Sequence, residues 1–406
     1  MGNDKKKKKG LFRKWIVKAH LWLGLLSGCI VLIASLSGAF YVFNEDITAF
    51  LRKDVIFHHE QNIQDKLPIP IRELKDLVNI QLKEQGETLL AEEVTIPIDP
   101  TRSYQFGIHL VDPNGWNYFN TYLVYKNVYV NQYTGKVLAV YNIRNNPFFF
   151  TMILHRSLLL SNSIGGTIVG VSTVIFAIML ITGIILWWPK NKNMRKQRFW
   201  FRWKKVKGWR RKNYDVHNIL GFYASFLAII IALTGIMYSF TITKHWVYVA
   251  LNGGDSQYPS YEQYVTTAPE SEETPTTIDA IIAQVREYYP QAYSFGLDLE
   301  DHEEADHHHE NFSIWIKDKE FTYAESHMMI FDEHSGKLLF DRSHQDKLVA
   351  QKAVDATYDL HVGAFFGFPG KVFAFVSSLF CASLPITGFL IWRGRRNKTK
   401  TSKNTQ

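Results

Sequence analysis

The sequence predicts a membrane protein with four transmembrane helices, built from one helix–module–helix unit used twice. Two apolar runs, 20–43 and 217–240, each begin at a histidine. Counted from that histidine, both carry Gly at +4 and +18, Tyr at +21 and Phe at +23. Two further apolar runs, 164–188 and 370–392, end in similar stretches, ITGIILWW and ITGFLIW. All four runs are long enough to cross a bilayer.

The remaining segments form two α+β modules and three basic connections. We expect the following order: basic N-terminus and first span, 1–43; module 1, 44–150; interfacial helix and second span, 151–188; basic loop, 189–213; third span, 214–240; module 2, 241–356; interfacial helix and fourth span, 357–392; basic tail, 393–406.

The distribution of charge predicts the orientation of the chain. The loop 189–213 holds twelve Lys and Arg and no acidic residue, and Lys5–Lys9 and the tail are also basic. By the positive-inside rule, both termini and this loop lie in the cytoplasm and both modules lie outside. The formal net charge is +8. Nucleic-acid binding is excluded as the role of the basic runs because they adjoin membrane helices.

The two modules share one predicted plan. The first contains a helix over 69–83, strands over 103–111, 116–125 and 128–131, and a hairpin turn at 112–115. The second contains a helix over 277–289 and strands over 292–299, 312–316 and 327–331. Each ends in a strand–turn–Gly–Lys–strand stretch, 128–139 and 329–340, which supports a duplicated unit.

Four histidines are the candidate chemical groups. His20 and His217 are expected near the cytoplasmic face, and His155 and His361 on short helices near the external face. A twofold axis along the membrane normal would bring them together as one pair in each leaflet. Two imidazoles are the axial ligands of an electron-transferring haem, so this pattern predicts two haem groups. The only two cysteines lie inside spans and form no haem-attachment motif, which favours haem b.

Glycines at fixed spacing predict where the porphyrins would fit. Eighteen residues are five helical turns, so Gly38 shares the azimuth of His20 at a rise of about 27 Å. Gly38 and Gly235 are therefore expected to flank the external haem. Gly183 and Gly388, at the opposite ends of their spans, are expected to flank the internal haem.

Several alternatives stay open at this stage. A Zn or Cu site is possible, although each leaflet supplies two ligands where tetrahedral sites need three or four. A proton relay could use the same histidines. Arg156 either pairs with a haem propionate or anchors the interface. His245 either lines the external site or snorkels, and the segment 301–310, with His307–His309, is either a loose metal site or a solvated hairpin tip.

The chain resembles the PepSY-associated transmembrane family over nearly its whole length. The likeness is carried by the following residues: His20, His217, Thr234-Gly235, His155–Leu158, Gly165-Gly166, Ile181–Gly183, Trp187-Trp188, and the Tyr133–Lys136 and His334–Lys337 turns. The resemblance implies a bacterial inner-membrane protein with two periplasmic PepSY-like modules. It also implies a likeness to ferric-siderophore reductases, which carry two b-type haems. The stretch 366–370 departs from the family pattern, and Pro385 is expected to interrupt the last span; neither removes a histidine.

The expected function is electron transfer across the membrane to a periplasmic ferric siderophore, with release of Fe(II) for uptake. The sequence has no flavin or nicotinamide domain, so the electron donor would be a separate protein or a quinol. No catalytic side chain is singled out, because no nucleophile–base motif is present. The rival hypothesis is a membrane-anchored PepSY protein that binds peptides or regulates a protease, without redox activity. The expected partners are membrane lipid, the siderophore and the donor.

Overall fold

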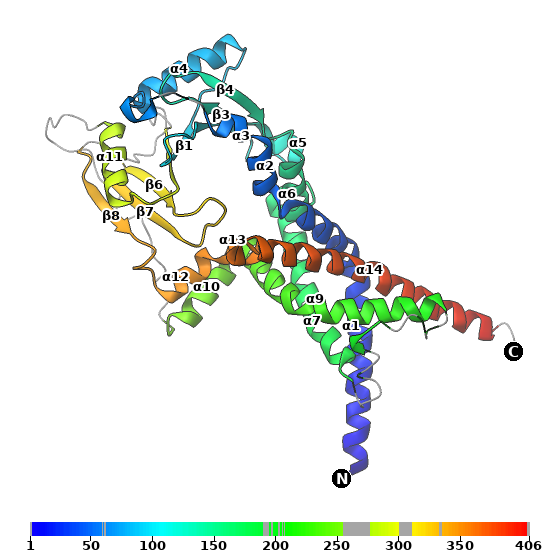
Figure 1. Cartoon of the computed structure of the whole chain (residues 1–406). Helices are drawn as coiled ribbons and strands as arrows, with labels where there is room; N and C mark the ends of the chain where they lie inside the picture. The colour runs from blue at the N-terminus through cyan, green and yellow to red at the C-terminus, as the bar shows by residue number, and fades with distance from the viewer. Residues whose placement is uncertain are drawn as a thin grey trace. The chain divides into compact units, whose positions relative to one another are not determined.

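The computed structural model describes the chain in two compact units (Figure 1). The described residues exclude 1, 59, 61, 190–194, 196, 197, 202, 203, 205, 207, 255–276, 300–310, 333, 334 and 404–406, and the side chains of 2–10, 64 and 397–403. Unit 1 comprises Met1–Phe43, Phe150–Thr243 and Leu360–Gln406, and unit 2 comprises Asn44–Phe149 and Lys244–Asp359.

Unit 1 is a bundle of four long helices. They are α1 (Gly2–Tyr41), α7 (Thr167–Trp187), α9 (Trp209–Ser239) and α14 (Gly367–Lys403). Both α1 and α9 pack against α7 and α14, so the first and the second spans of the two halves alternate around the bundle. Among the described residues, four helical stretches are long and apolar enough to cross a membrane. The chain is a multi-pass membrane protein, as predicted.

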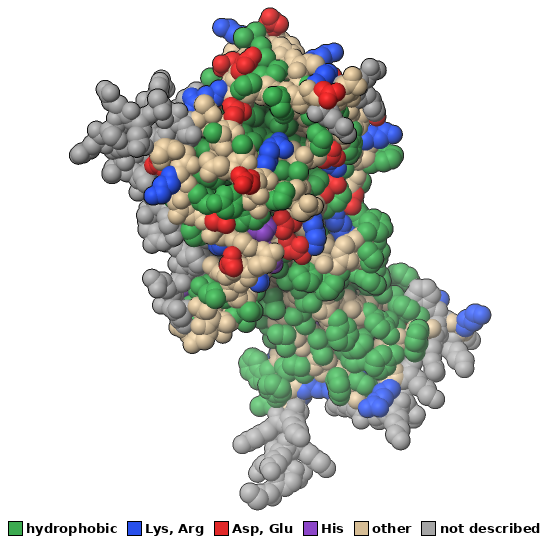
Figure 2. All heavy atoms as spheres, turned by 60° about the vertical axis from the view of Figure 1, so that its left-hand side comes forward, with side chains coloured by type: hydrophobic (Ala, Val, Ile, Leu, Met, Phe, Trp, Pro, Cys, Tyr) green, Lys and Arg blue, Asp and Glu red, His purple; other side chains and the backbone are tan. Residues whose placement is uncertain are grey.

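The outer face of the bundle is apolar. Large hydrophobic side chains stay exposed on all four helices, including Trp22 on α1, Ile181 on α7, Phe226 on α9 and Phe373 on α14. Figure 2 shows such side chains covering the surface of the bundle, with Lys and Arg at one end. An apolar patch of this extent on a folded chain requires lipid around it.

A short helix precedes the second span of each half, as the sequence predicts. The elements are α6 (Pro147–Ser157) with a π-helical turn, η2 (Asn162–Gly166), and α13 (Thr357–Val362) with a 3-10 turn, η6 (Ala364–Phe366). In both halves, the backbone after the short helix passes very close to the backbone at the end of that helix, and a glycine stands at the point of closest approach. A Cβ at Gly165 would lie 1.8 Å from the carbonyl oxygen of Ser157, and one at Gly370 would lie 2.1 Å from that of Gly363. Only glycine permits so close a crossing.

Unit 2 contains one eight-stranded antiparallel sheet in the order β4-β3-β2-β1-β5-β6-β7-β8. Its elements are α2 (Asn44–Leu51), α3 (Lys53–Ile56), η1 (Ile63–Asp65), α4 (Ile71–Glu84), β1 (Glu93–Pro97), β2 (Tyr104–Val111), α5 (Tyr118–Thr121), β3 (Tyr122–Val130), β4 (Val137–Asn142), α10 (Thr241–Leu251), α11 (Ile278–Tyr288), β5 (Ser294–Asp298), β6 (Asn311–Lys317), β7 (Ser326–Asp332), β8 (Leu338–Arg342) and α12 (Val349–Asp355).

One hydrophobic core holds unit 2 together. The buried faces of α4 and α11 supply Leu74 and Ile281 to it, and alternate strand residues such as Phe106 and Ile314 supply the rest. The two strand turns that the sequence matches at an offset of 201 are built alike. The side chain of Asn131 accepts from the backbone N–H groups of Tyr133 and Thr134, while that of Asp332 accepts from Ser335.

The strands of the two segments join at β1 and β5, where Val94 pairs with Leu297. Arg102 strengthens this junction, since its guanidinium lies 3.0 Å from Glu320 and stacks 4.5 Å from the ring of Phe57. The sequence analysis assigns no strand to 93–97, so it did not predict this joining.

Two local predictions need correction. The predicted strand 116–125 is interrupted by α5, because the side chain of Asn117 caps a helical turn by accepting from the N–H groups of Phe119 and Asn120. The strand that follows runs unbroken from Tyr122 to Val130. Pro385 does not interrupt the fourth span, since α14 continues through it.

Candidate functional site

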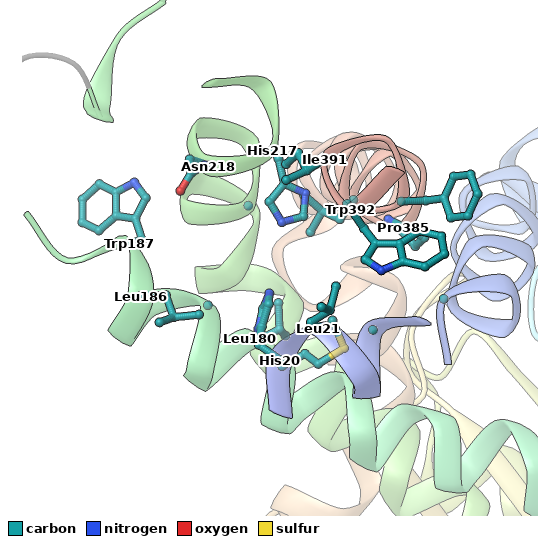
Figure 3. Close-up of a pocket in the computed structure, with 18 of the residues that line it drawn as sticks. His20, Leu21, Leu180, Leu186, Trp187, His217, Asn218, Pro385, Ile391 and Trp392 are labelled. Atoms are coloured by element: carbon teal, nitrogen blue, oxygen red, sulfur yellow. The ribbon is translucent and has the colours of Figure 1, made fainter. Parts of the chain in front are cut away.

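The four predicted histidines all lie within the helix bundle, in two pairs. His20 on α1 and His217 on α9 line one cavity of about 380 Å³. Figure 3 shows the two imidazoles entering the site from these two helices. The cavity wall is largely apolar and includes Leu180, Phe222 and Trp392. We call His20 and His217 the first pair.

His155 on α6 and His361 on α13 form the second pair. Their ring centroids are 5.9 Å apart, at an interplanar angle of 64°. Tyr238 on α9 lies beside His361, with ring centroids 6.1 Å apart. His155 contacts α1 close to Gly38, about 27 Å along that helix from His20. The two pairs therefore occupy different levels of the bundle.

Each histidine is held through its Nδ1 atom. The distances from Nδ1 to the Oγ1 atom of a threonine are 2.9 Å for His20–Thr182, for His217–Thr387 and for His361–Thr234. Nδ1 of His155 lies 2.8 Å from the main-chain carbonyl oxygen of Ala34. All four contacts join a histidine to a helix of its own half of the chain.

The acceptors fix the position of the proton on each ring. Each threonine hydroxyl donates its one hydrogen to a carbonyl of the preceding helical turn, as Thr182 does to Ile178 and Met179. The hydroxyl oxygen therefore accepts from the Nδ1–H of the histidine. A carbonyl oxygen, such as that of Ala34, can only accept. In a neutral imidazole with hydrogen at Nδ1, the Nε2 atom carries the free lone pair.

A glycine faces each imidazole. A Cβ built on Gly183 would lie 3.4 Å from Cε1 of His20, and one on Gly388 would lie 3.4 Å from Cε1 of His217. For Gly235 and His361 the corresponding distance is 3.3 Å, and for Gly38 and His155 it is 3.0 Å. The four glycines singled out by the sequence therefore leave room for the imidazole rings themselves. Each glycine lies on the helix that packs against its histidine.

The other candidates are Arg156, His245 and the segment 301–310. Arg156 is exposed on α6 and forms no hydrogen bond or ion pair with any residue that the structure describes. His245 is half-buried on α10 and belongs to unit 2. The segment 301–310, with His307–His309, lies outside the described residues. Within the described part of the chain, no three His, Cys, Asp or Glu residues gather as a metal site.

The sequence reasoning missed the three threonines that hold the rings. A signal for them was present, because each immediately precedes a glycine already singled out: Thr182-Gly183, Thr234-Gly235 and Thr387-Gly388. At the fourth position the residue before Gly38 is Ser37. Its hydroxyl donates to the carbonyls of Ile33 and Ala34 and does not contact His155.

The sequence profile of the PepSY-associated TM region matches residues 17–395, which is nearly the whole chain and includes all four histidines. The protein is a member of this family. No curated protein matches the chain significantly. The PepSY-associated TM region thus spans both the helix bundle and unit 2.

Proposed function

We propose that this protein carries electrons across the membrane through two bis-histidine haem b groups and reduces a ferric siderophore on the external side. The observation that carries the proposal is the hydrogen bonding of the four histidine rings. All four are bonded through Nδ1, which leaves each Nε2 lone pair for a metal. Ligand histidines in metalloproteins are oriented in this way by a hydrogen bond from the other ring nitrogen.

The spacing of the second pair fits one metal ion between two imidazoles. A metal ion held by both imidazoles at about 2 Å would require their ring centroids to lie within roughly 6 Å of each other. The centroids of His155 and His361 are 5.9 Å apart. A tetrahedral Zn or Cu site would need further ligands, and the described residues offer no third His, Cys, Asp or Glu. Two axial ligands are what a haem requires.

The chain would contribute orientation and the exclusion of water. The threonine hydroxyls and the Ala34 carbonyl fix the ring planes, and the glycines admit the rings close to the helices. At the first pair, the largely apolar walls would limit the access of water. When bound, haem iron supplies one-electron oxidation and reduction without exchange of ligands.

We further propose that the chain arose as a duplicated unit and that unit 2 contains two PepSY-like modules. The repeated order of helix and four strands supports this reading, as do the matched turns at Asn131 and Asp332. Basic residues at 189–213 favour a cytoplasmic position for this loop and both termini, in a bacterial inner membrane. The first pair would then face the cytoplasmic donor, a protein or a quinol.

The test is ferric-chelate reduction by the purified protein in lipid nanodiscs. A chemically reduced sample is mixed with ferrioxamine, and Fe(II) is trapped with a colorimetric chelator. We expect His155→Ala with His361→Ala to abolish formation of Fe(II). We expect His20→Ala with His217→Ala to lower the Fe(II) formed per protein, because only one pre-reduced haem remains to supply an electron. His245→Ala serves as the matched control and should leave it unchanged. Undiminished reduction by both double variants would disconnect the histidines from the activity.

A further inference from the structure

The four histidines are not held alike, and the exception lies in the second pair. Thr234 and Ser37 occupy the same place, immediately before the glycines that face His361 and His155. The hydroxyl of Thr234 accepts from His361 at 2.9 Å. Nδ1 of His155 instead lies 2.8 Å from the carbonyl oxygen of Ala34.

A second observation agrees with this difference. A Cβ on Gly38 would lie 3.0 Å from Cε1 and 3.1 Å from Nδ1 of His155, whereas one on Gly235 would lie 3.3 Å and 3.9 Å from the same atoms of His361. His155 therefore sits closer to the backbone of its partner helix. Serine lacks the γ-methyl group of threonine. Ser37 and Thr234 make equivalent bonds to carbonyls of the preceding turn, so the difference lies in the ring of His155, whose Nδ1 meets the Ala34 carbonyl and not the hydroxyl.

The nature of the acceptor governs how strongly a ligand histidine donates to its metal. A peptide carbonyl is more polar than a hydroxyl and polarises the Nδ1–H bond further. The imidazole then becomes more basic at Nε2, and a more basic ligand favours the ferric over the ferrous state. In the first pair both acceptors are threonine hydroxyls, Thr182 and Thr387.

We propose that the serine at position 37 makes His155 the most strongly donating of the four ligands, and the haem of the second pair the stronger reductant of the two. This inference rests on the proposed function, and it specifies the class of acceptor. A strongly reducing site on the external side suits Fe(III) that is tightly held by oxygen ligands and hard to reduce. Ser37 is thereby a positioning residue, acting through the bond between Ala34 and His155.

Redox titration of the full-length protein, followed by its visible spectrum, tests the inference. Ser37→Thr supplies the residue of the second half of the chain. We expect the lower of the two midpoint potentials to rise. The equilibrium ratio of ferric to ferrous haem at a given potential should fall three- to tenfold. At 59 mV per tenfold for one electron, this is about 30–60 mV. The higher midpoint should stay where it is, and the ferric low-spin resonance of only one haem should shift.

Three further variants make the outcome decisive. Thr234→Ser should lower the same midpoint, because His361 is then expected to donate to the carbonyl oxygen of Ile231, which stands to position 234 as Ala34 stands to Ser37. Ser37→Ala adds no volume and leaves the Ala34 carbonyl to His155, so the lower midpoint should hold or fall. Thr167→Val, on α7, removes a hydroxyl that bonds to the carbonyl of Ser163 and contacts no ligand histidine. This control should change neither midpoint.

The inference and the proposed function fail differently. A protein without haem overturns the proposed function. A protein with two haems whose midpoints ignore Ser37→Thr, or in which the higher midpoint moves instead, overturns only the inference. A rise of the lower midpoint in Ser37→Ala also overturns it.

Discussion

The distances between glycines and imidazoles predict a graded response to a single added methyl group. A Cβ at Gly38 would lie 3.0 Å from Cε1 of His155, which is closer than such contacts normally allow. At Gly183 the corresponding distance to His20 is 3.4 Å, an ordinary contact. Gly38→Ala must therefore displace the His155 ring, while Gly183→Ala leaves the His20 ring in place.

The expected size of the effect follows from overpacking. Forcing a methyl group into a filled site costs about 1–3 kcal/mol, which corresponds to roughly 5- to 150-fold weaker binding. We expect Gly38→Ala to weaken haem binding at the second pair by that factor. Gly235→Ala, at 3.3 Å from His361, should have a smaller effect. The larger side chain of Gly38→Leu should remove this haem altogether and leave the haem of the first pair bound.

Haem transfer to excess apomyoglobin measures the effect, since the rate and amplitude report each haem separately. Gly394→Ala on α14 is the control, because its Cβ would meet only the Arg210 side chain, at 3.8 Å. Two results would refute the reasoning. One is wild-type retention of both haems by Gly38→Ala, and the other is a loss in Gly183→Ala as large as in Gly38→Ala.

Two further predictions concern unit 2. The buried amino group of Lys347 donates to Asp355 at 2.6 Å. Lys347→Met should therefore lower the free energy of unfolding by about 1.5–3 kcal/mol in denaturant titrations of the full-length protein. An unchanged denaturation midpoint would contradict this prediction. Burial, with the hydrogen bond to Asp341, raises the pKa of Tyr289 above its usual range. Above about pH 10 the unfolded chain loses this proton and the folded chain keeps it, so stability falls by up to about 1.4 kcal/mol per pH unit. Tyr289→Phe should remove that part of the alkaline decline, and equal slopes for both proteins would count against the assignment.

The membrane helices and the pairing of the histidines were predictable because they rest on repetition. Hydropathy located the four spans, and the matched spacing after His20 and His217 placed equivalent residues on equivalent faces. Helices α4 and α11 of unit 2 were also predictable, since both have clear apolar faces and Thr277 caps α11 through the N–H of Ala280. Hydropathy, residue spacing and apolar periodicity within each segment were sufficient to predict these helices and histidine pairs.

The remaining features depend on contacts that local pattern does not encode. The pairing of β1 with β5 joins residues about 200 positions apart, and nothing near Val94 indicates its partner. The helical turn at Tyr118 arose from one side chain, Asn117, inside an aromatic stretch typical of a strand. The role of Thr182 was hidden because a threonine inside an apolar helix usually bonds only to its own backbone.

The central claim is that the chain holds two metals, one between each pair of histidines. The most direct measurement is the haem content of protein purified from haem-replete cells, combined with the low-spin ferric resonance spectrum. The account predicts two bis-imidazole haems per chain. It also predicts that His20→Ala with His217→Ala removes one of them, and His155→Ala with His361→Ala removes the other. A haem-free protein, or one whose haem survives both double substitutions, would contradict it.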